Sequence, residues 1–194
     1  MNSFDARVRY TRMVIEQSFL ELLKEKPVAK VTVTELCEKA QINRATFYKH
    51  YLDIPDLLEK LEEALFDQIR ISFGSEKVKL KEFLIKMMHH TKENQMRYLA
   101  LGGDNGDPNL MTKTFLVCYE SAYPLVEQNM PGMKESERQM LYHFLSQGAG
   151  GILTWWIKNG MREQPEDVAQ FILGVCSITT TGIKNCDWRN MYQE

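Results

Sequence analysis

Apolar side chains recur at intervals of three and four residues along most of the chain, and this spacing is typical of one buried face of an α-helix. The first run places Val8, Ile15 and Phe19 on one face and must end before Pro27, because proline breaks a helix interior. Glycine, proline, serine and asparagine clusters interrupt the later runs. About nine helices are predicted, over residues 8–26, 33–39, 44–51, 53–72, 80–88, 94–101, 108–130, 136–159 and 165–184.

Strand-like content is confined to residues 28–33, a segment too short and isolated to build a sheet. The clearest loop is residues 102–108, where three glycines and a proline occur among seven residues. The chain has no internal repeat and no low-complexity segment. We therefore expect an all-α fold with about nine helices and short connections.

The N-terminal quarter contains the signals for two short helices joined by a tight turn. Thr32 and Glu35 have the spacing of a capping box, in which the hydroxyl accepts the N–H of residue 35 and the carboxylate reaches back to that of residue 32. A three-residue break ends at Asn43, a favoured N-cap for the second helix. Phe47 and Tyr51 are expected on the inner face of that helix. The arrangement predicts a helix-turn-helix motif.

The outward positions of the second helix offer cationic groups, hydroxyls and a methyl group, which are the chemistry that reads base edges and contacts phosphates in a DNA major groove. A helix-turn-helix shape without DNA binding is also common in all-α proteins. No acidic residue occurs in this helix, although a solvated surface helix of its length usually contains one. The acid-free face therefore favours DNA binding. The outward residues are Arg44, Ala45, Thr46, Tyr48, Lys49 and His50.

Charge is distributed unevenly along the chain. Residues 1–51 carry nine Lys or Arg against six Asp or Glu, whereas the other 143 residues carry 15 basic and 20 acidic groups. The formal net charge of −2 excludes a uniformly basic surface but not a local one. The N-terminal quarter is therefore the part expected to meet a polyanion.

The chain has no apolar run that approaches the ~18 residues needed to span a bilayer. Its N-terminus is polar where a secretory signal would need an apolar stretch. The four cysteines lack a paired spacing and are expected to be reduced. These features favour a cytoplasmic protein with no membrane partner.

The helix-turn-helix segment resembles the DNA-binding domain of the tetracycline-repressor (TetR) family over roughly residues 8–60. Two positions depart from the family pattern. Gln41 stands where the family usually has glycine in a left-handed turn, and Ile54-Pro55 stands where many members have a lysine. The N-terminus of the helix that follows could still present its N–H groups to a phosphate. The matching residues are 31–33, Leu36, Ala40, 42–44, 46–48, Tyr51 and 57–58.

The resemblance implies a division of roles among the DNA-binding residues. Arg44 and Lys49 are expected to supply affinity, and Thr46 and Arg44 to select bases. Tyr48 and Thr34 are expected to contact backbone phosphates. It also implies a DNA-binding domain over residues 1–52, followed by an effector-binding and dimerisation domain over residues 53–194. The predicted DNA contacts are Arg7, Arg9, Tyr10, Thr34, Arg44, Ala45, Thr46, Tyr48, Lys49 and His50.

In this family the last two long helices usually pair with those of a second subunit. Both candidate helices here carry glycines, which cost roughly 1 kcal/mol each in helix propensity and make most sense where another backbone comes close. Ordinary intramolecular core would explain the apolar residues equally well but the glycines less well. The predicted dimer residues are Phe144, Leu145, Gly148, Ile152, Trp156, Phe171, Gly174 and Ile178.

A ligand pocket would lie among the middle helices, where methionine and aromatic residues recur. Such residues at helical spacing are more often plain core. No cluster of metal ligands suggests itself, and no cofactor is expected. The candidate ligand residues are Met87, Met88, His90, Tyr98, Phe115, Tyr119 and Tyr123.

Enzymatic activity is the competing class, but the chain has no nucleophile elbow, phosphate-binding loop, dinucleotide motif or zinc-protease motif. The sequence therefore favours a homodimeric, ligand-responsive repressor that binds a palindromic double-stranded DNA operator. Two alternatives remain open at this point. The regulator could respond to a protein partner, or the chain could bind small molecules without binding DNA.

Overall fold

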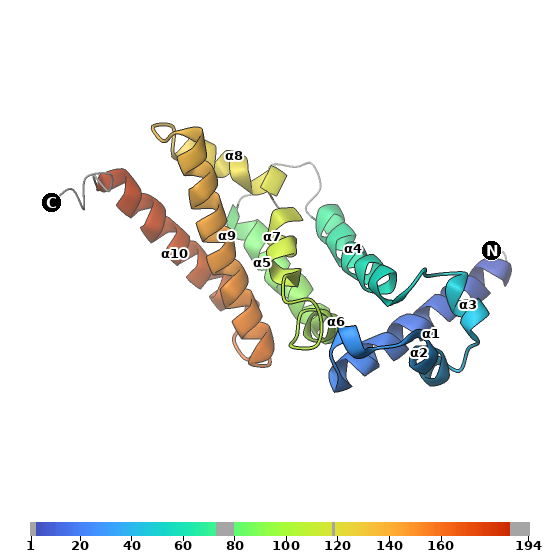
Figure 1. Cartoon of the computed structure of the whole chain (residues 1–194). Coiled ribbons are helices and arrows are strands. Elements are labelled where there is room, and N and C mark those ends of the chain that lie inside the picture. The colour runs from blue at the N-terminus through green and yellow to red at the C-terminus, as the bar shows by residue number, and fades with distance from the viewer. Residues whose placement is uncertain (1–2, 73–79, 118, 187–194) are drawn as a thin grey trace. The chain divides into compact units, whose positions relative to one another are not determined.

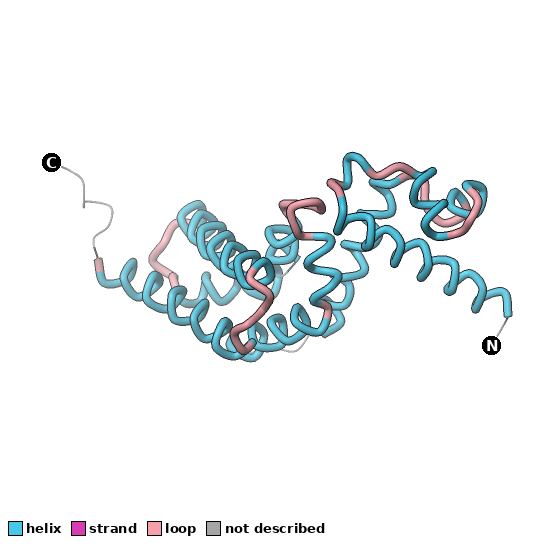
Figure 2. The backbone as a smooth tube through the Cα atoms, turned by 90° about the horizontal axis from the view of Figure 1, so that it is seen from below, coloured by secondary structure: helices cyan, strands magenta, loops and turns pink. Residues whose placement is uncertain are grey.

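The computed structural model describes residues 3–72, 80–117 and 119–186, and within these ranges it contains helices and no strand (Figures 1 and 2). The predicted all-α fold is confirmed. The elements are α1 (Ser3–Glu25), η1 (Val28–Lys30), α2 (Val33–Ala40), α3 (Arg44–Tyr48), α4 (Ile54–Ser72), α5 (Leu80–Glu93), α6 (Gln95–Leu101), α7 (Leu110–Val117), α8 (Tyr119–Asn129), α9 (Glu135–Lys158) and α10 (Pro165–Asn185).

Two predicted segments differ from the structure in the kind or number of their elements. The strand-like segment begins with the single 3-10 turn η1, and the run predicted over 108–130 is two helices, α7 and α8. An apolar face continues from one helix into the next, so the spacing of apolar residues cannot show where the first helix ends. The sequence therefore predicted that this region is helical, but not that it divides into two helices.

The chain folds into two compact units that do not follow the linear order of the sequence. Unit 1 combines Met1–Gln68 with Asn94–Leu110, and unit 2 combines Ile69–Glu93 with Met111–Glu194. The division of function after residue 52 stays a prediction. Packing places α4 mostly in unit 1 and adds α6 to it, although α6 is distant in sequence.

The core of unit 1 is formed by one apolar face from each of its helices. Phe19 of α1, Leu36 of α2, Phe47 of α3 and Leu57 of α4 are fully buried. Each such side chain stabilises the fold by roughly 1.5–3 kcal/mol through its removal from water. Tyr98 of α6 is also fully buried, and α6 packs on α1.

Unit 2 is organised around the packing of α5, α9 and α10. α10 contacts α5 and α9, and α8 contacts α9. Trp156 is the largest fully buried side chain, and its indole Nε1–H donates to the backbone oxygen of Glu163 at 3.3 Å. Met87 of α5 and Ala169 of α10 are also fully buried.

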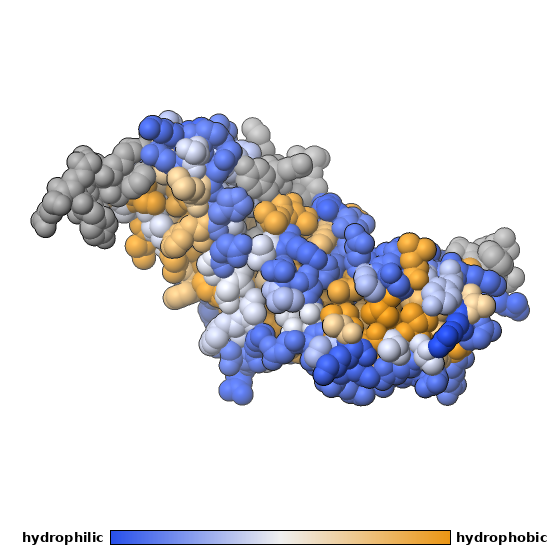
Figure 3. Space-filling model, in the orientation of Figure 1, coloured by the Kyte–Doolittle hydropathy of each residue, from blue (hydrophilic) through white to orange (hydrophobic). Residues whose placement is uncertain are grey.

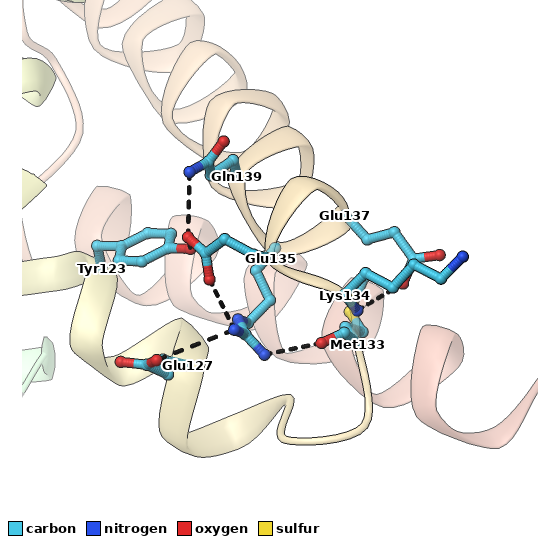
Figure 4. Close-up of polar contacts among 8 residues, drawn as sticks. Tyr123, Glu127, Met133, Lys134, Glu135, Glu137 and Gln139 are labelled. Atoms are coloured by element: carbon cyan, nitrogen blue, oxygen red, sulfur yellow. Dashed lines mark hydrogen bonds and ion pairs between the residues drawn. The ribbon is translucent and has the colours of Figure 1, made fainter.

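A cluster of polar side chains ties α8 to the start of α9 (Figure 4). The Tyr123 hydroxyl donates to Glu135 Oε1, and Arg138 Nη2 donates to Glu135 Oε2 at 2.6 Å. Arg138 Nη1 also donates to the backbone oxygen of Met133 at 2.7 Å. The hydrogen bonds that Glu135 accepts, above all from Tyr123 and then from Arg138 and Gln139, hold the pKa of its carboxyl group below the usual value.

Glu135→Gln is expected to lower the melting temperature near pH 7 and to have a shrinking effect as the solution is acidified. A carboxyl group whose pKa is depressed on folding stabilises the protein above its unfolded pKa of about 4.3, and it loses that contribution as pH falls through its folded pKa. Thermal unfolding of both proteins between pH 7 and pH 3 tests this. Tyr123→Phe should show the same trend, and a Glu135→Gln effect equal at every pH would contradict the assignment.

Candidate nucleic-acid interface

Only one of the two hydrogen bonds of the predicted capping box is formed at the start of α2. Thr32 adopts an extended backbone conformation, and its Oγ1 accepts the backbone N–H of Glu35 at 3.3 Å. The Glu35 carboxylate forms an ion pair with the Lys26 ammonium group instead of completing the capping box. The predicted bond from the N–H of residue 32 to the Glu35 carboxylate is therefore corrected to an ion pair with Lys26. A nearby cation attracts a carboxylate more strongly than a neutral N–H does.

The turn between α2 and α3 keeps the left-handed shape of the family pattern without its glycine. Gln41 has φ 53° and ψ 42°. Its N–H donates to Glu38 O at 3.2 Å, and the N–H of Ile42 donates to Cys37 O at 3.0 Å. These two bonds form a Schellman motif that ends α2. A residue with a side chain costs about 1–2 kcal/mol in this conformation, so the turn stores strain at Gln41.

Asn43 begins α3 and fixes the conformation of its first turn. Asn43 Oδ1 accepts the backbone N–H of Thr46 at 2.7 Å and the Thr46 hydroxyl at 2.9 Å. The N-cap prediction is thereby confirmed. The Thr46 hydroxyl donates its proton within the protein, so toward DNA it offers acceptor lone pairs and a methyl group.

The recognition helix is shorter than predicted, because α3 ends at Tyr48 and residues 49–50 form a turn. The inner face is as expected, with Phe47 fully buried and Tyr51 nearly so. One more backbone bond spans four residues beyond the helix end, from the N–H of Tyr51 to Phe47 O at 3.0 Å. The chain then turns into α4.

The predicted outward residues of this segment all reach solvent. Arg44, Ala45, Tyr48 and Lys49 are exposed, and Thr46 and His50 are half-buried. The Tyr48 ring meets the edge of Phe47 at 5.5 Å between centroids, and this contact directs an exposed phenol outward from a buried anchor. The face therefore combines two cations, hydroxyls and an imidazole, with no carboxylate among residues 44–50.

Two predicted DNA contacts from different helices are brought together. Arg44 Nη2 donates a hydrogen bond to Oγ1 of Thr34 in the first turn of α2. The guanidinium group therefore lies beside the α2 N-terminus, where the helix dipole also favours an anion. Arg7, Arg9 and Tyr10 are exposed on α1.

Arg12 is a further cation of this surface that sequence reasoning did not select. It is exposed on α1, and its positive charge acts on His50. Burial, followed by the charges of Arg12 and Lys49, lowers the pKa of His50, so the imidazole is mainly neutral at pH 7. The signal in the sequence was the spacing of Arg9 and Arg12, since residues three apart share a helix face.

The start of α4 is occupied by its own carboxylates. Asp53 Oδ1 accepts the N–H of Asp56 at 2.8 Å, and Asp56 Oδ2 accepts the N–H of Leu52 at 2.8 Å. Lys60 Nζ donates to Asp56 Oδ2 at 2.8 Å, and this bond lowers the pKa of Asp56. Of the N–H groups within the first turn of α4, that of Asp56 is already accepted by Asp53, and the expectation that this helix end presents N–H groups to a phosphate stays a prediction.

The candidate ligand residues belong to both units of the chain. Met87 and Met88 are fully buried on α5, and burial lowers the pKa of half-buried His90. Tyr98 belongs to unit 1, whereas the three α5 residues belong to unit 2. The Tyr123 hydroxyl is bound to Glu135 (Figure 4). The side chains of Phe115 and Tyr119 lie outside the described residues.

The predicted dimer surface is mostly exposed, with one correction. Phe144 and Ile178 are 67% and 76% exposed, and Leu145 and Ile152 are half-buried. Trp156 is 0% exposed, so it cannot contact a second chain, and its neighbour Trp155 is 54% exposed instead. Successive helical residues point about 100° apart, so the predicted stripe was displaced by one position at this point.

We call the exposed apolar surface of α9 and α10 the α9–α10 face. Figure 3 shows apolar surface over these two helices. A Cβ atom added at Gly148, Gly151 or Gly174 would meet nothing within 4 Å, so these glycines leave open space on the helices. The face is formed by Phe144, Gly148, Gly151, Trp155, Phe171, Gly174, Val175 and Ile178.

The α9–α10 face contains a groove with a volume of about 640 Å³. Gly148, Gly151, Trp155 and Phe171 line it. Two carboxylates, from Glu163 and Asp167, also line the groove. None of the predicted ligand residues lines this groove.

In the described parts of the chain, no group of three or more His, Cys, Asp or Glu side chains could hold a metal ion. Within the same residues, no helix is both long and apolar enough to cross a bilayer.

A family model described as "Transcriptional regulator C-terminal region" matches residues 79–177, which are 99 of the 194 residues. The chain belongs to the TetR family of transcriptional regulators. Members of this family bind DNA and act as dimers. The family assignment from the helix-turn-helix residues is thus confirmed by a match to a different part of the chain.

Individual proteins show the same likeness. The chain is 26% identical over 176 residues to the uncharacterized HTH-type transcriptional regulator YxbF of Bacillus subtilis (strain 168). That match covers 87% of this chain and 45% of the relative, so the chain spans about half the length of the curated relative it matches.

Solved structures of regulators have the same fold. A TetR transcriptional regulator from Streptococcus agalactiae 2603V matches with a TM-score of 0.70 and 25% identity, over 90% of this chain and 99% of that one. The dihydroxyacetone kinase operon activator DhaS matches with a TM-score of 0.59 and 19% identity, over 88% of this chain and 96% of that one. The second likeness shows the fold alone.

Replacing the strained turn residue should stabilise this TetR regulator. Gln41→Gly removes the left-handed penalty but increases the freedom of the unfolded chain, so we expect a net gain of about 0.5–1 kcal/mol in the free energy of unfolding. Gln41→Val should destabilise the protein, because a β-branched residue tolerates positive φ poorly. Urea unfolding at pH 7 measures both. A Gln41→Gly variant less stable than wild type would contradict the strain assigned to this turn.

Proposed function

We propose that this chain is a homodimeric transcriptional repressor that binds a palindromic DNA operator through α3 and releases it when a ligand binds. The observation that carries the proposal is the exposed face of residues 44–50, which offers cations, hydroxyls and an imidazole without a carboxylate. Such a face suits both the negative potential of the major groove and the acceptor pattern of its base edges.

Contacts in the proposed complex divide into those that position the protein and those that select sequence. Arg44 and Thr46 read bases, with Ala45 as a methyl contact and His50 as a neutral imidazole at the groove. Lys49 supplies a charge to a phosphate, and Tyr48 supplies a hydroxyl. The remaining proposed phosphate contacts are Arg7, Arg9, Tyr10 and Thr34. We add Arg12, because its positive charge acts on His50 in the recognition segment.

We place the dimer contact on the α9–α10 face. A two-fold arrangement of two such faces would bury large apolar side chains and fill the open space above the helix glycines. A two-fold dimer of a helix-turn-helix protein reads two half-sites about one DNA turn apart, on the order of 34 Å or a little more. A palindromic site follows from that symmetry.

We propose that a small-molecule effector binds unit 2 and weakens DNA binding, with Met87, Met88, His90 and Tyr123 as the candidates within that unit. α4 supports this proposal, because it is one continuous helix whose residues Ile54–Gln68 belong to unit 1 and whose last turn belongs to unit 2. A ligand that prefers one position of α4 would change operator affinity, and bound operator would change ligand affinity by the same factor. A protein partner acting on unit 2 is the alternative effector.

Selection of bound duplexes from a random DNA library tests the central proposal. We expect enrichment of one motif with two inverted half-sites, and retarded complexes that contain two protein chains. Binding with no preference for any sequence would contradict the proposal. Effector affinity measured with and without saturating operator then tests the coupling, and equal affinities would show that the compound tested is not the effector.

Lys49→Ala should weaken binding to the selected duplex and to a random duplex alike, because a phosphate contact carries no sequence information. We expect the slope of log K against log salt to fall in magnitude by about one ion. Thr46→Ala should instead change the preferred base at one position of each half-site with little effect on the slope. Lys81→Ala, an exposed cation on α5, is the matched control. A Lys49→Ala variant with altered base preference and an unchanged slope would reverse these roles.

Ile178→Asp should convert a dimer into monomers at micromolar concentration, because it places a carboxylate in the centre of an apolar contact. Trp155→Asp should act in the same way. Ile71→Asp is the matched control, since Ile71 of α4 is 81% exposed and Ile178 is 76% exposed. Sedimentation equilibrium gives the mass of each variant. A wild-type monomer, or an Ile71→Asp effect equal to that of Ile178→Asp, would contradict the proposed face.

A further inference from the structure

A chain of polar contacts in unit 1 links α6 to the end of the recognition segment. Arg97 Nη2 of α6 contacts Glu16 Oε2 of α1 at 3.2 Å, and Tyr51 donates its hydroxyl hydrogen to Glu16 Oε1 at 3.1 Å. Each carboxylate oxygen of Glu16 therefore accepts a hydrogen bond from a different residue. We call the three residues the Arg97–Glu16–Tyr51 chain.

Tyr51 carries this chain to the residues that face DNA. Its backbone N–H donates to Phe47 O at 3.0 Å, and its ring lies 5.8 Å from the Phe47 ring. Lys60 of α4 lies over the same ring at 5.3 Å, and Lys60 Nζ donates to the backbone oxygen of His50 at 3.3 Å. Tyr51 thus touches α1 with its hydroxyl group and touches the core of α3 with its ring.

The segment that holds α6 has a second attachment to α1. Asn105 Nδ2 donates to Leu23 O at 2.9 Å, and the backbone oxygen of Asn105 accepts the N–H of Val28 at 2.7 Å. Asn105 follows α6 and satisfies backbone groups at and after the end of α1. Two separate contacts therefore fasten residues 94–110 along α1, although some 70 residues separate the two segments in sequence.

We propose that Arg97 is a positioning residue for DNA recognition, which acts through Glu16 and Tyr51 to set the orientation of α3. This inference rests on the proposed binding of DNA by the α3 face. α3 has five residues and cannot maintain its own geometry, so its orientation is set by what its buried side chains contact. The Arg97 cation compensates the negative charge of Glu16. One oxygen of that carboxylate can therefore keep its hydrogen bond from the hydroxyl group of Tyr51, which is nearly buried.

The proposal separates sequence-specific affinity from general affinity for DNA. A misoriented α3 loses base contacts that depend on direction, whereas the attraction of Lys49, Arg12 and other surface cations to phosphates depends little on angle. Arg97 itself belongs to α6 and makes no proposed contact with DNA. Its effect on specificity can therefore only arise through the protein.

The experiment uses the full chain and two duplexes of equal length, the selected operator and a random sequence. Arg97→Met should weaken operator binding by about three- to tenfold, as is usual for coupled networks, and leave binding to the random duplex unchanged. Tyr51→Phe removes only the hydroxyl group and should give a similar change. Arg97→Lys should restore most of the affinity, because an ammonium group can still bind the Glu16 carboxylate.

The double variant Arg97→Met/Tyr51→Phe tests whether the two residues act as one unit. We expect a loss no larger than that of the more affected single variant, since either change breaks the same chain. Glu166→Gln removes an exposed ion pair with His89 in unit 2 and is the matched control, expected to bind as wild type. Thermal unfolding identifies the temperature at which every variant is folded, and binding is measured below it.

Three outcomes would overturn the inference while the DNA-binding proposal stands. These are an unchanged operator affinity in Arg97→Met and Tyr51→Phe, equal losses on both duplexes, and losses that simply add in the double variant. A wild-type protein that shows no preference for any duplex would instead overturn the proposed function.

Discussion

The short recognition helix depends on the contacts at its two ends. A helix of five residues is too short to form alone in water, because nucleation fixes several dihedral angles for the first hydrogen bond. The left-handed turn at Gln41 and the Asn43 cap define where α3 begins, and Phe47 and Tyr51 attach it to the core. The α3 part of the proposed DNA-binding surface is built on that attachment.

Several carboxylates in unit 1 form ion pairs with lysine or arginine side chains. Glu35 pairs with Lys26, Glu16 with Arg97, and Asp56 with Lys60. These ion pairs are partly exposed, so each contributes little to stability. Their placement matters more for the local potential, because the cations of α3 then face solvent without an acidic neighbour on their own helix.

Unit 2 shows how one pair of adjacent residues can serve two purposes. Trp156 fills the interior and uses its indole N–H within the unit, while Trp155 extends the apolar surface of α9. The open space above Gly148 and Gly151 lies on the same side as Trp155. A surface with large apolar groups beside empty space is suited to a complementary surface of the same kind. That match is the physical basis of the proposed dimer.

The sequence by itself determined the all-α class, the family and the capped start of α3, because helical spacing, the matching motif residues and the cap each involve residues close along the chain. Only the tertiary structure decided that Trp155 and not Trp156 is exposed and that Arg97 meets Glu16. These features depend on which groups meet after the helices pack. A spacing of three or four residues defines a helix face, but it does not tell which distant segment will cover that face.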